Sequence, residues 1–160
     1  MKRRVVITGM GVVSPIGNDV EQVWDSVQHS RCGIDRITHF DASDFRAKLA
    51  GEVRNLDMEQ YFTKRDLKFN DRFTQFTRIA AKQAYENSGL QDAEFNRDRF
   101  GVIIGSGIGG ISTIEGASQT IESRGPSRIS PYFIPMSLIN LAAGSAAIDM
   151  DAHGNVSSVV

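Results

Sequence analysis

The side chains that could act as a nucleophile, a general base or a metal ligand are few and widely separated in this sequence. The single cysteine, Cys32, follows Arg31, and an adjacent arginine can lower a thiol pKa. The three histidines, His29, His39 and His153, stand at a helix end and in two loops, without a metal-binding or nucleophile–base spacing. We therefore predict exposed histidines, a Cys32 that is not a nucleophile, and no metal site. Catalytic chemistry is absent from this stretch or supplied by residues outside it.

The densest group of unusual residues is FGVIIGSGIGG, from Phe100 to Gly110. Its apolar residues 101–104 predict a short strand buried on both faces, as in a sheet covered by helices. Four of the next six residues are glycine, which suits a sharp turn or a close approach to the backbone. From residue 111 a helical pattern begins. The order strand, glycine turn and helix is typical of a nucleotide-binding turn.

A dinucleotide-binding domain is therefore an alternative that must be tested. Gly105, Gly107 and Gly110 fit the pattern G-x-G-x-x-G, and Gly9 and Gly11 begin a second, incomplete match. The full fingerprint also needs a following strand that ends in an acidic residue. Residues 111–123 instead keep a helical pattern that ends at a Gly-Pro pair. A tight turn without a ligand and a turn shaped for another ligand both remain open, and we favour the latter.

The composition is that of a soluble globular domain. Of the 160 residues, 41% are hydrophobic and 23% are charged, and the net charge is −1, so the chain has no overall attraction to nucleic acid or anionic membrane. No apolar run approaches the ~18 residues of a membrane span. The basic and apolar start of the chain is interrupted by glycine and polar residues, so we predict a first strand rather than a signal peptide. We expect a cytoplasmic protein.

Strands and helices are predicted to alternate along the chain, which indicates a layered α/β fold. The predicted strands are residues 4–8, 51–56, 101–104 and 156–160, and the predicted helices are 20–28, 72–88, 111–123 and 136–149, with a loop at 127–135. Asn18 or Asp19 caps the first helix, and Asn70 or Asp71 caps the second. The second helix carries an apolar stripe, formed by Phe73, Phe76, Ala80 and Ala84. A parallel strand normally leads into a further loop and helix, so we expect from residues 156–160 that the chain is part of a longer fold.

Several long motifs together resemble one family. They are RVVITGMGVVSPIGND at residues 4–19, HFDASDF at 39–45, GVIIGSGIGG at 101–110 and GPSRISPYFIPMSLINLAAG at 125–144. These stretches resemble the β-ketoacyl-acyl-carrier-protein synthases, especially the elongating type II enzymes of bacterial fatty-acid synthesis. The likeness runs in register over essentially the whole chain.

The resemblance implies an α/β thiolase-like fold, in which two similar halves stack as α-β-α-β-α layers and the protein works as a homodimer. It also implies an acyltransferase activity, decarboxylative Claisen condensation, in which a cysteine takes the acyl chain and two histidines stabilise an oxyanion. In the family that cysteine follows the strand that residues 156–160 resemble, and both histidines come later. We therefore expect residues 1–160 to be an incomplete N-terminal portion of the synthase domain that ends before the nucleophile. Such a portion has no catalytic residue or cofactor of its own and is inactive alone.

The resemblance also implies binding residues. Ile108, beside Gly107, matches the position that gates the acyl pocket, and Phe133 matches the residue that approaches the partner's acyl pocket across the dimer interface. Five cations resemble the surface that receives the acidic carrier protein: Lys64, Arg65, Lys68, Arg124 and Arg128. Phe133 as an ordinary core or interface aromatic, and the cations as a plain solvated face, remain alternatives.

Three functions are therefore compared below. The first is the N-terminal portion of a condensing enzyme, with acyl carrier protein and a second copy of the chain as partners. The second is a non-catalytic module that binds carrier protein and dimerises. The third is the dinucleotide-binding domain. Neither nucleic acid nor a membrane is expected as a partner, because the net charge is −1 and no apolar span is present.

Overall fold

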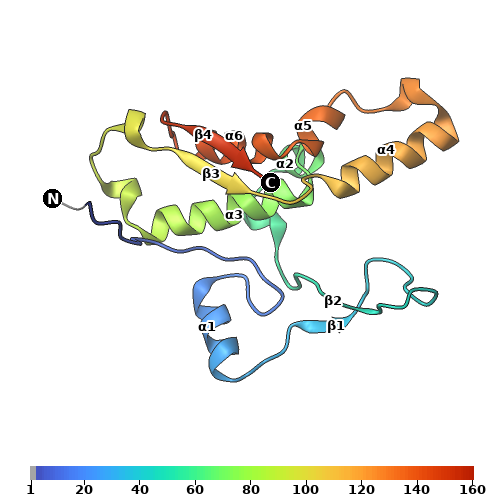
Figure 1. Cartoon of the computed structure of the whole chain (residues 1–160), viewed down its shortest axis with the longest axis horizontal. Helices are drawn as coiled ribbons and strands as arrows, with labels where there is room; N and C mark the ends of the chain where they lie inside the picture. The colour runs from blue at the N-terminus through green and yellow to red at the C-terminus, as the bar shows by residue number, and fades with distance from the viewer. Residues whose placement is uncertain (1–2) are drawn as a thin grey trace.

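The computed structural model describes residues 3–160 and shows the predicted mixture of helices and strands (Figure 1). The helices are α1 (Val20–Gln28), α2 (Lys64–Phe69), α3 (Arg72–Asn87), α4 (Ile111–Arg124), α5 (Phe133–Ser137) and α6 (Ile139–Asp149). The strands are β1 (Ile34–Arg36), β2 (Leu49–Gly51), β3 (Val102–Gly105) and β4 (Val156–Val159). Figure 1 shows α1 and the β1–β2 hairpin on one side of the long helix α3, with the remaining elements on the other.

The core lies between α6 and the parallel pair β3–β4. Val102 pairs with Val156, and the register continues to Gly105 and Val159. Val102 packs against the alanines of α6, Ala143, Ala146 and Ala147, all of which are buried. Alanine side chains are short, so the helix axis can approach the strands closely. Helix α3 packs against α6 and completes this unit.

The prediction that β3 is buried on both faces is wrong for this structure. Val102 is 6% exposed, whereas its neighbour Ile103 is 66% exposed. Successive side chains of a strand point to opposite faces. Helix α6 covers the face of Val102, and within residues 3–160 no second layer covers the face of Ile103.

The predicted strand at residues 4–8 does not form. Residues 3–13 run without a strand partner, and Val5 is 96% exposed. The segment lies along α3 instead, where the Met10 amide donates to Asn87 Oδ1 over 3.0 Å and the Val12 amide to Gln83 Oε1 over 2.9 Å. An apolar run becomes a strand only when another strand supplies its hydrogen bonds, and none of the strands in residues 3–160 pairs with residues 4–8.

The N-terminal glycines are explained by this packing. A Cβ atom at Gly9 would collide with the carbonyl oxygen of Ala84, and one at Gly11 with the carbonyl oxygen of Ala80. Both oxygens belong to α3. The glycines therefore let the N-terminal segment approach the helix backbone, which is a structural role and not a nucleotide site.

Helices α1 and α3 begin where the sequence predicts. Asp19 caps α1 by accepting from the Gln22 amide, and Asp71 caps α3 by accepting from the Phe73 amide. Helix α3 ends before Gly89, whose φ is 70°. Its most buried residues are Thr74, Gln75 and Ile79, whereas the predicted apolar stripe is only half-buried, so that prediction is wrong in detail. Gln75 can be buried there because its side chain finds a partner: Nε2 donates to the carbonyl oxygen of Asn70 over 2.8 Å.

Three boundaries differ from the predictions. The short strand predicted at residues 51–56 is displaced: β2 ends at Gly51, pairs antiparallel with β1, and residues 52–56 form no strand. The loop predicted at 127–135 contains a 3₁₀ turn, Pro126–Arg128, and the start of α5. The single helix predicted at 136–149 is two helices, because Leu138 adopts an extended ψ of 134° between α5 and α6. No helix in the described part of the chain has the length and apolar character needed to cross a bilayer.

Candidate functional site

The glycine turn is residues 106–110, between β3 and α4. Gly109 has a φ of 88°, a left-handed conformation that favours glycine. A Cβ atom there would also lie 2.5 Å from the carbonyl oxygen of Ser137. The Gly109 amide donates to Ser106 Oγ over 3.2 Å, and the Gly110 amide donates to that Ser137 oxygen over 3.0 Å. Two of the glycines are therefore needed because the turn lies directly against the junction of α5 and α6.

Ile108 is the one large side chain in the glycine turn, and it is 64% exposed. A Cβ atom at the adjacent Gly107 would meet no atom within 4 Å. Ile108 therefore projects beside open space rather than into the core. The structure places it where a ligand could reach it, and an acyl pocket around it stays a prediction.

Phe133 is the first residue of α5 and is half-buried. Its amide donates to the Ser130 carbonyl oxygen over 3.0 Å. Helix α5 ends at Ser137, the residue that contacts the glycine turn, so the fold brings the turn and the Phe133 helix together. The predicted role of Phe133 toward a partner subunit stays a prediction.

The start of α4 is held by a residue from another helix. Asp71 Oδ2 accepts from the Thr113 amide over 2.9 Å and from Thr113 Oγ1 over 2.6 Å. In a dinucleotide-binding fold a phosphate occupies this place at the N-terminus of the helix. Here a carboxylate occupies it, which argues against the dinucleotide-binding alternative. The sequence identified Asp71 as a helix cap, but no local signal pointed to Thr113, which is 42 residues away.

The five predicted docking cations are all exposed. Lys64, Arg65 and Lys68 lie on α2, whereas Arg124 ends α4 and Arg128 lies in the 3₁₀ turn that follows. The rings of Phe69 and Tyr132, 4.1 Å apart between centroids, join the two segments. Within residues 3–160 none of the five cations forms an ion pair. We call these five residues the basic surface.

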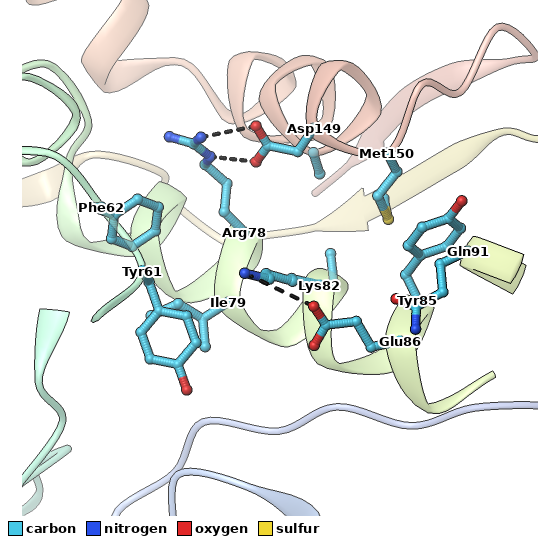
Figure 2. Close-up of a pocket in the computed structure, with 12 residues that line it drawn as sticks. Tyr61, Phe62, Arg78, Ile79, Lys82, Tyr85, Glu86, Gln91, Asp149 and Met150 are labelled. Carbon is cyan, nitrogen blue, oxygen red and sulfur yellow. Dashed lines mark hydrogen bonds and ion pairs between the residues drawn. The ribbon is translucent and has the colours of Figure 1, made fainter. Parts of the chain in front are cut away.

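A half-buried arginine holds α2 in place. Arg78 of α3 donates to both carboxylate oxygens of Asp149 in α6, over 2.6 and 2.8 Å (Figure 2). It also lies 3.5 Å from Asp66 Oδ1 in α2. The hydrogen bonds that Arg78 donates to Asp149 raise the pKa of Arg78. Hydrogen bonding from the Thr63 side chain, with burial opposing it, lowers the pKa of Asp66. The helix that carries three cations of the basic surface is therefore oriented by charged contacts on its inner side.

A cavity of about 330 Å³ lies beside this arginine. Figure 2 shows side chains from α3 and α6, with Tyr61 and Phe62, around it. None of the predicted site residues lines it. Because its arginine is neutralised by Asp149 and Asp66, the cavity offers no unpaired guanidinium to an anionic ligand.

The candidate nucleophile and bases are not brought together. Cys32 is exposed, and so are all three histidines. His29 contacts Asp25, and His153 contacts Asp151. His39 lies 4.0 Å from Glu52, a buried carboxylate whose pKa is lowered to about 2, chiefly by hydrogen bonds from Thr38. The described residues contain no group of three histidine, cysteine or acidic side chains placed to hold a metal ion.

Comparisons with known proteins agree with the motifs. Residues 2–160 match the family model described as beta-ketoacyl synthase, N-terminal domain. The chain is 44% identical to 3-oxoacyl-[acyl-carrier-protein] synthase 2 of Staphylococcus aureus (strain COL) over 152 residues, which are 95% of the chain and 37% of the relative. It is 46% identical to the Vibrio cholerae protein of the same name over 153 residues, which are 96% of the chain and 37% of the relative. The chain thus spans little more than a third of the length of these relatives.

Solved structures show the same fold. The ishigamide ketosynthase/chain length factor superposes with a TM-score of 0.87 at 26% identity, over 100% of this chain and 40% of that chain. A β-ketoacyl synthase from Burkholderia phymatum gives 0.77 at 20% identity, over 97% and 39%. The polyketide ketosynthase AntDE, solved in complex with its acyl carrier protein AntF, also gives 0.77, at 21% identity over 95% and 40%. The arrangement of helices and strands is thus that of the thiolase-like ketosynthases, as predicted.

The chain therefore belongs to the β-ketoacyl synthase family and corresponds to its N-terminal domain.

Proposed function

We propose that this chain is the N-terminal portion of a 3-oxoacyl-acyl-carrier-protein synthase that elongates fatty acids. The observation that carries the proposal is the identity of 44–46% with proteins of that name, over 95–96% of the chain. The reaction joins an acyl group held as a thioester to the carbon of a malonyl group that loses CO₂. The thiolate and the two histidines of that reaction are supplied by residues outside this chain.

The contribution of this chain to the reaction is acyl-chain selection. The glycine turn presents one bulky side chain, Ile108, on backbone that is fixed against α5 and α6. Bulk at one point of a rigid wall limits how far a long apolar chain can extend, whereas a two-carbon acyl group does not reach it. Phe133, whose helix contacts the same turn, approaches the corresponding pocket of the second subunit of a homodimer.

The basic surface receives the acyl carrier protein. An acidic partner is attracted to exposed cations that are not already paired, and within residues 3–160 the five cations of this surface are exposed and form no ion pair. The complex of AntDE with its carrier protein shows that a protein of this fold forms such an assembly. Carrier-dependent fatty-acid synthesis places the protein in the cytoplasm.

Condensation by a complete synthase tests the proposal. Residues 1–160 are joined, in register, to the remaining part of the Vibrio cholerae relative, and the product is measured with acyl-carrier and malonyl-carrier protein. We expect β-ketoacyl product from the joined protein and none from the 160-residue chain alone. A joined protein that binds carrier protein and folds but makes no product would favour the non-catalytic module instead.

Cys32 provides the control in this experiment. It is exposed and has no histidine partner, so Cys32→Ser leaves condensation by the joined protein unchanged. Product formed by the isolated chain and abolished by Cys32→Ser would overturn the proposal and make Cys32 the nucleophile.

A further inference from the structure

One carboxylate serves the starts of two helices. Asp71 is 6% exposed, and its Oδ1 atom accepts from the Phe73 amide of α3 over 3.4 Å. Its Oδ2 atom accepts from the amide and the hydroxyl of Thr113 in the first turn of α4. Negative charge is stabilised at a helix N-terminus, and here it lies at two of them.

Helix α4 has no cap of its own. Its N-cap residue is Gly110, which makes no side-chain hydrogen bond to the helix. The first amides of a helix have no partner within it, so the Thr113 amide needs an acceptor from elsewhere. Asp71 supplies that acceptor from 42 residues away.

The position of Asp71 is itself fixed. It lies two residues after α2 ends at Phe69, and the buried side chain of Gln75 ties the connecting segment to α3. Gln75 Nε2 donates to the carbonyl oxygen of Asn70 over 2.8 Å and to that of Leu67 over 3.3 Å. The hydrogen bonds of Gln75 therefore fix the segment that carries the Asp71 carboxylate, independently of the contact between Asp71 and α4.

The hydrogen bonds between Thr113 and Asp71 fix the chain on the C-terminal side of the glycine turn. At the near end, β3 is fixed by its ladder with β4. At the last residue of the turn, the Gly110 amide donates to the Ser137 carbonyl oxygen. The hydrogen bonds to Thr113 fix the first turn of α4, which begins three residues after Ile108. Without them, the bond from the Gly110 amide to Ser137 is the one hydrogen bond among residues 3–160 that ties the C-terminal end of the turn to another element.

From this arrangement we infer that Asp71, acting through Thr113, is a positioning residue that holds the Ile108 turn and thereby sets acyl-chain selectivity. The inference rests on the proposed condensing function. Asp71 does not touch the acyl chain; it fixes the backbone from which Ile108 projects.

The test uses the complete synthase whose residues 1–160 are this chain. Asp71→Asn keeps an oxygen for the cap of α3, because asparagine caps as well as aspartate does, but it removes one acceptor and the charge facing Thr113. Thr113→Val removes the hydroxyl donor alone. We expect each change to lower kcat/KM for sixteen-carbon relative to two-carbon acyl groups by about 2- to 12-fold, the range that corresponds to one hydrogen bond.

Two further variants separate positioning from general stability. Thr113→Ser restores the hydroxyl and is expected to restore the selectivity. Thr120→Val is the matched control, because Thr120 lies on the same helix and, within residues 3–160, its hydroxyl donates only to the Gly116 carbonyl oxygen of its own helix. Losses that are equal for all chain lengths, or a selectivity ratio that stays constant while the melting temperature falls, would overturn the inference.

Amide hydrogen exchange gives a readout that does not need activity. The peptide covering residues 106–114 is expected to exchange faster in Asp71→Asn and Thr113→Val, and at the unmodified rate in Thr120→Val. Unchanged exchange in the first two variants would overturn the anchoring role. If exchange changes as expected but the unmodified synthase makes no product, the proposed condensing function fails and the anchoring role stands.

Discussion

The glycine turn and the basic surface, the two regions to which we assign function, are built by opposite means. The turn depends on bare backbone in contact with Ser137 and on a buried carboxylate, and it exposes one apolar side chain. The basic surface consists of five exposed cations from two segments joined by a pair of aromatic rings. At Gly109 an added methyl group is enough to cause a collision, whereas on the basic surface only the summed charge matters. Single substitutions in the turn should therefore change acyl-chain preference or stability strongly, whereas single substitutions on the basic surface should change carrier binding only weakly.

The largest expected effect comes from Ile108→Phe in the complete synthase. A ring at this position overfills the wall that a long acyl chain must pass, and overfilling a packed site costs about 1–3 kcal/mol. Long chains should therefore lose kcat/KM by roughly 5- to 150-fold relative to a two-carbon acyl group. Acylation rates over a two- to sixteen-carbon series measure this.

Ile121→Phe is the matched control for Ile108→Phe. Ile121 is on α4 and 46% exposed, but it lies at the far end of that helix from the turn. We expect no change in chain-length preference. Parallel losses across the series in Ile108→Phe, with a lower melting temperature, would mean that Ile108 is a packing residue and not a gate.

The next effect compares two glycines of the same turn. Gly109→Ala introduces a side chain at a φ of 88° and against the Ser137 carbonyl oxygen, so it should lower the free energy of unfolding by about 1–3 kcal/mol. Gly107→Ala meets no atom within 4 Å and should change it by less than about 0.5 kcal/mol. Urea unfolding of both variants measures the difference, and equal losses would contradict the close contact with Ser137.

The smallest effect per residue is expected on the basic surface. Each exposed ion pair with carrier protein contributes roughly 0.2–1 kcal/mol, so single changes should be hard to detect. Reversing the charges of Lys64, Arg65 and Lys68 together should weaken carrier binding measurably at low salt, and the loss should shrink as salt screens the charges.

Lys82→Glu provides the comparison for the triple reversal. Lys82 is also an exposed cation, but it lies on α3 beside Glu86, outside the basic surface. Its reversal should leave carrier binding unchanged. Carrier affinity that ignores the triple reversal and does not respond to salt would remove the docking role of α2.

Much of the fold follows from signals that are local in the sequence. A helix cap, a helical period and a stop at glycine each involve residues within about one turn of one another, so α1 and α3 begin where Asp19 and Asp71 predict. The family, too, was identified from the motifs alone, whereas the roles of Ile108 and of the cations of the basic surface stay predictions from the resemblance. The glycine pattern predicted a turn correctly, but it fitted a nucleotide site almost as well.

The tertiary structure alone decided which partner each segment meets. Residues 4–8 have a strand's composition but form no strand and are exposed, and Ile103 of β3 is exposed where the apolar run predicted burial. The contact of Asp71 with Thr113 spans 42 residues, and neither residue type predicts a contact with the other. Composition and spacing report the preferences of one segment at a time. A hydrogen-bond acceptor or a packing surface contributed by a distant segment exists only after the chain has folded, because the backbone between them can place the two ends in many ways.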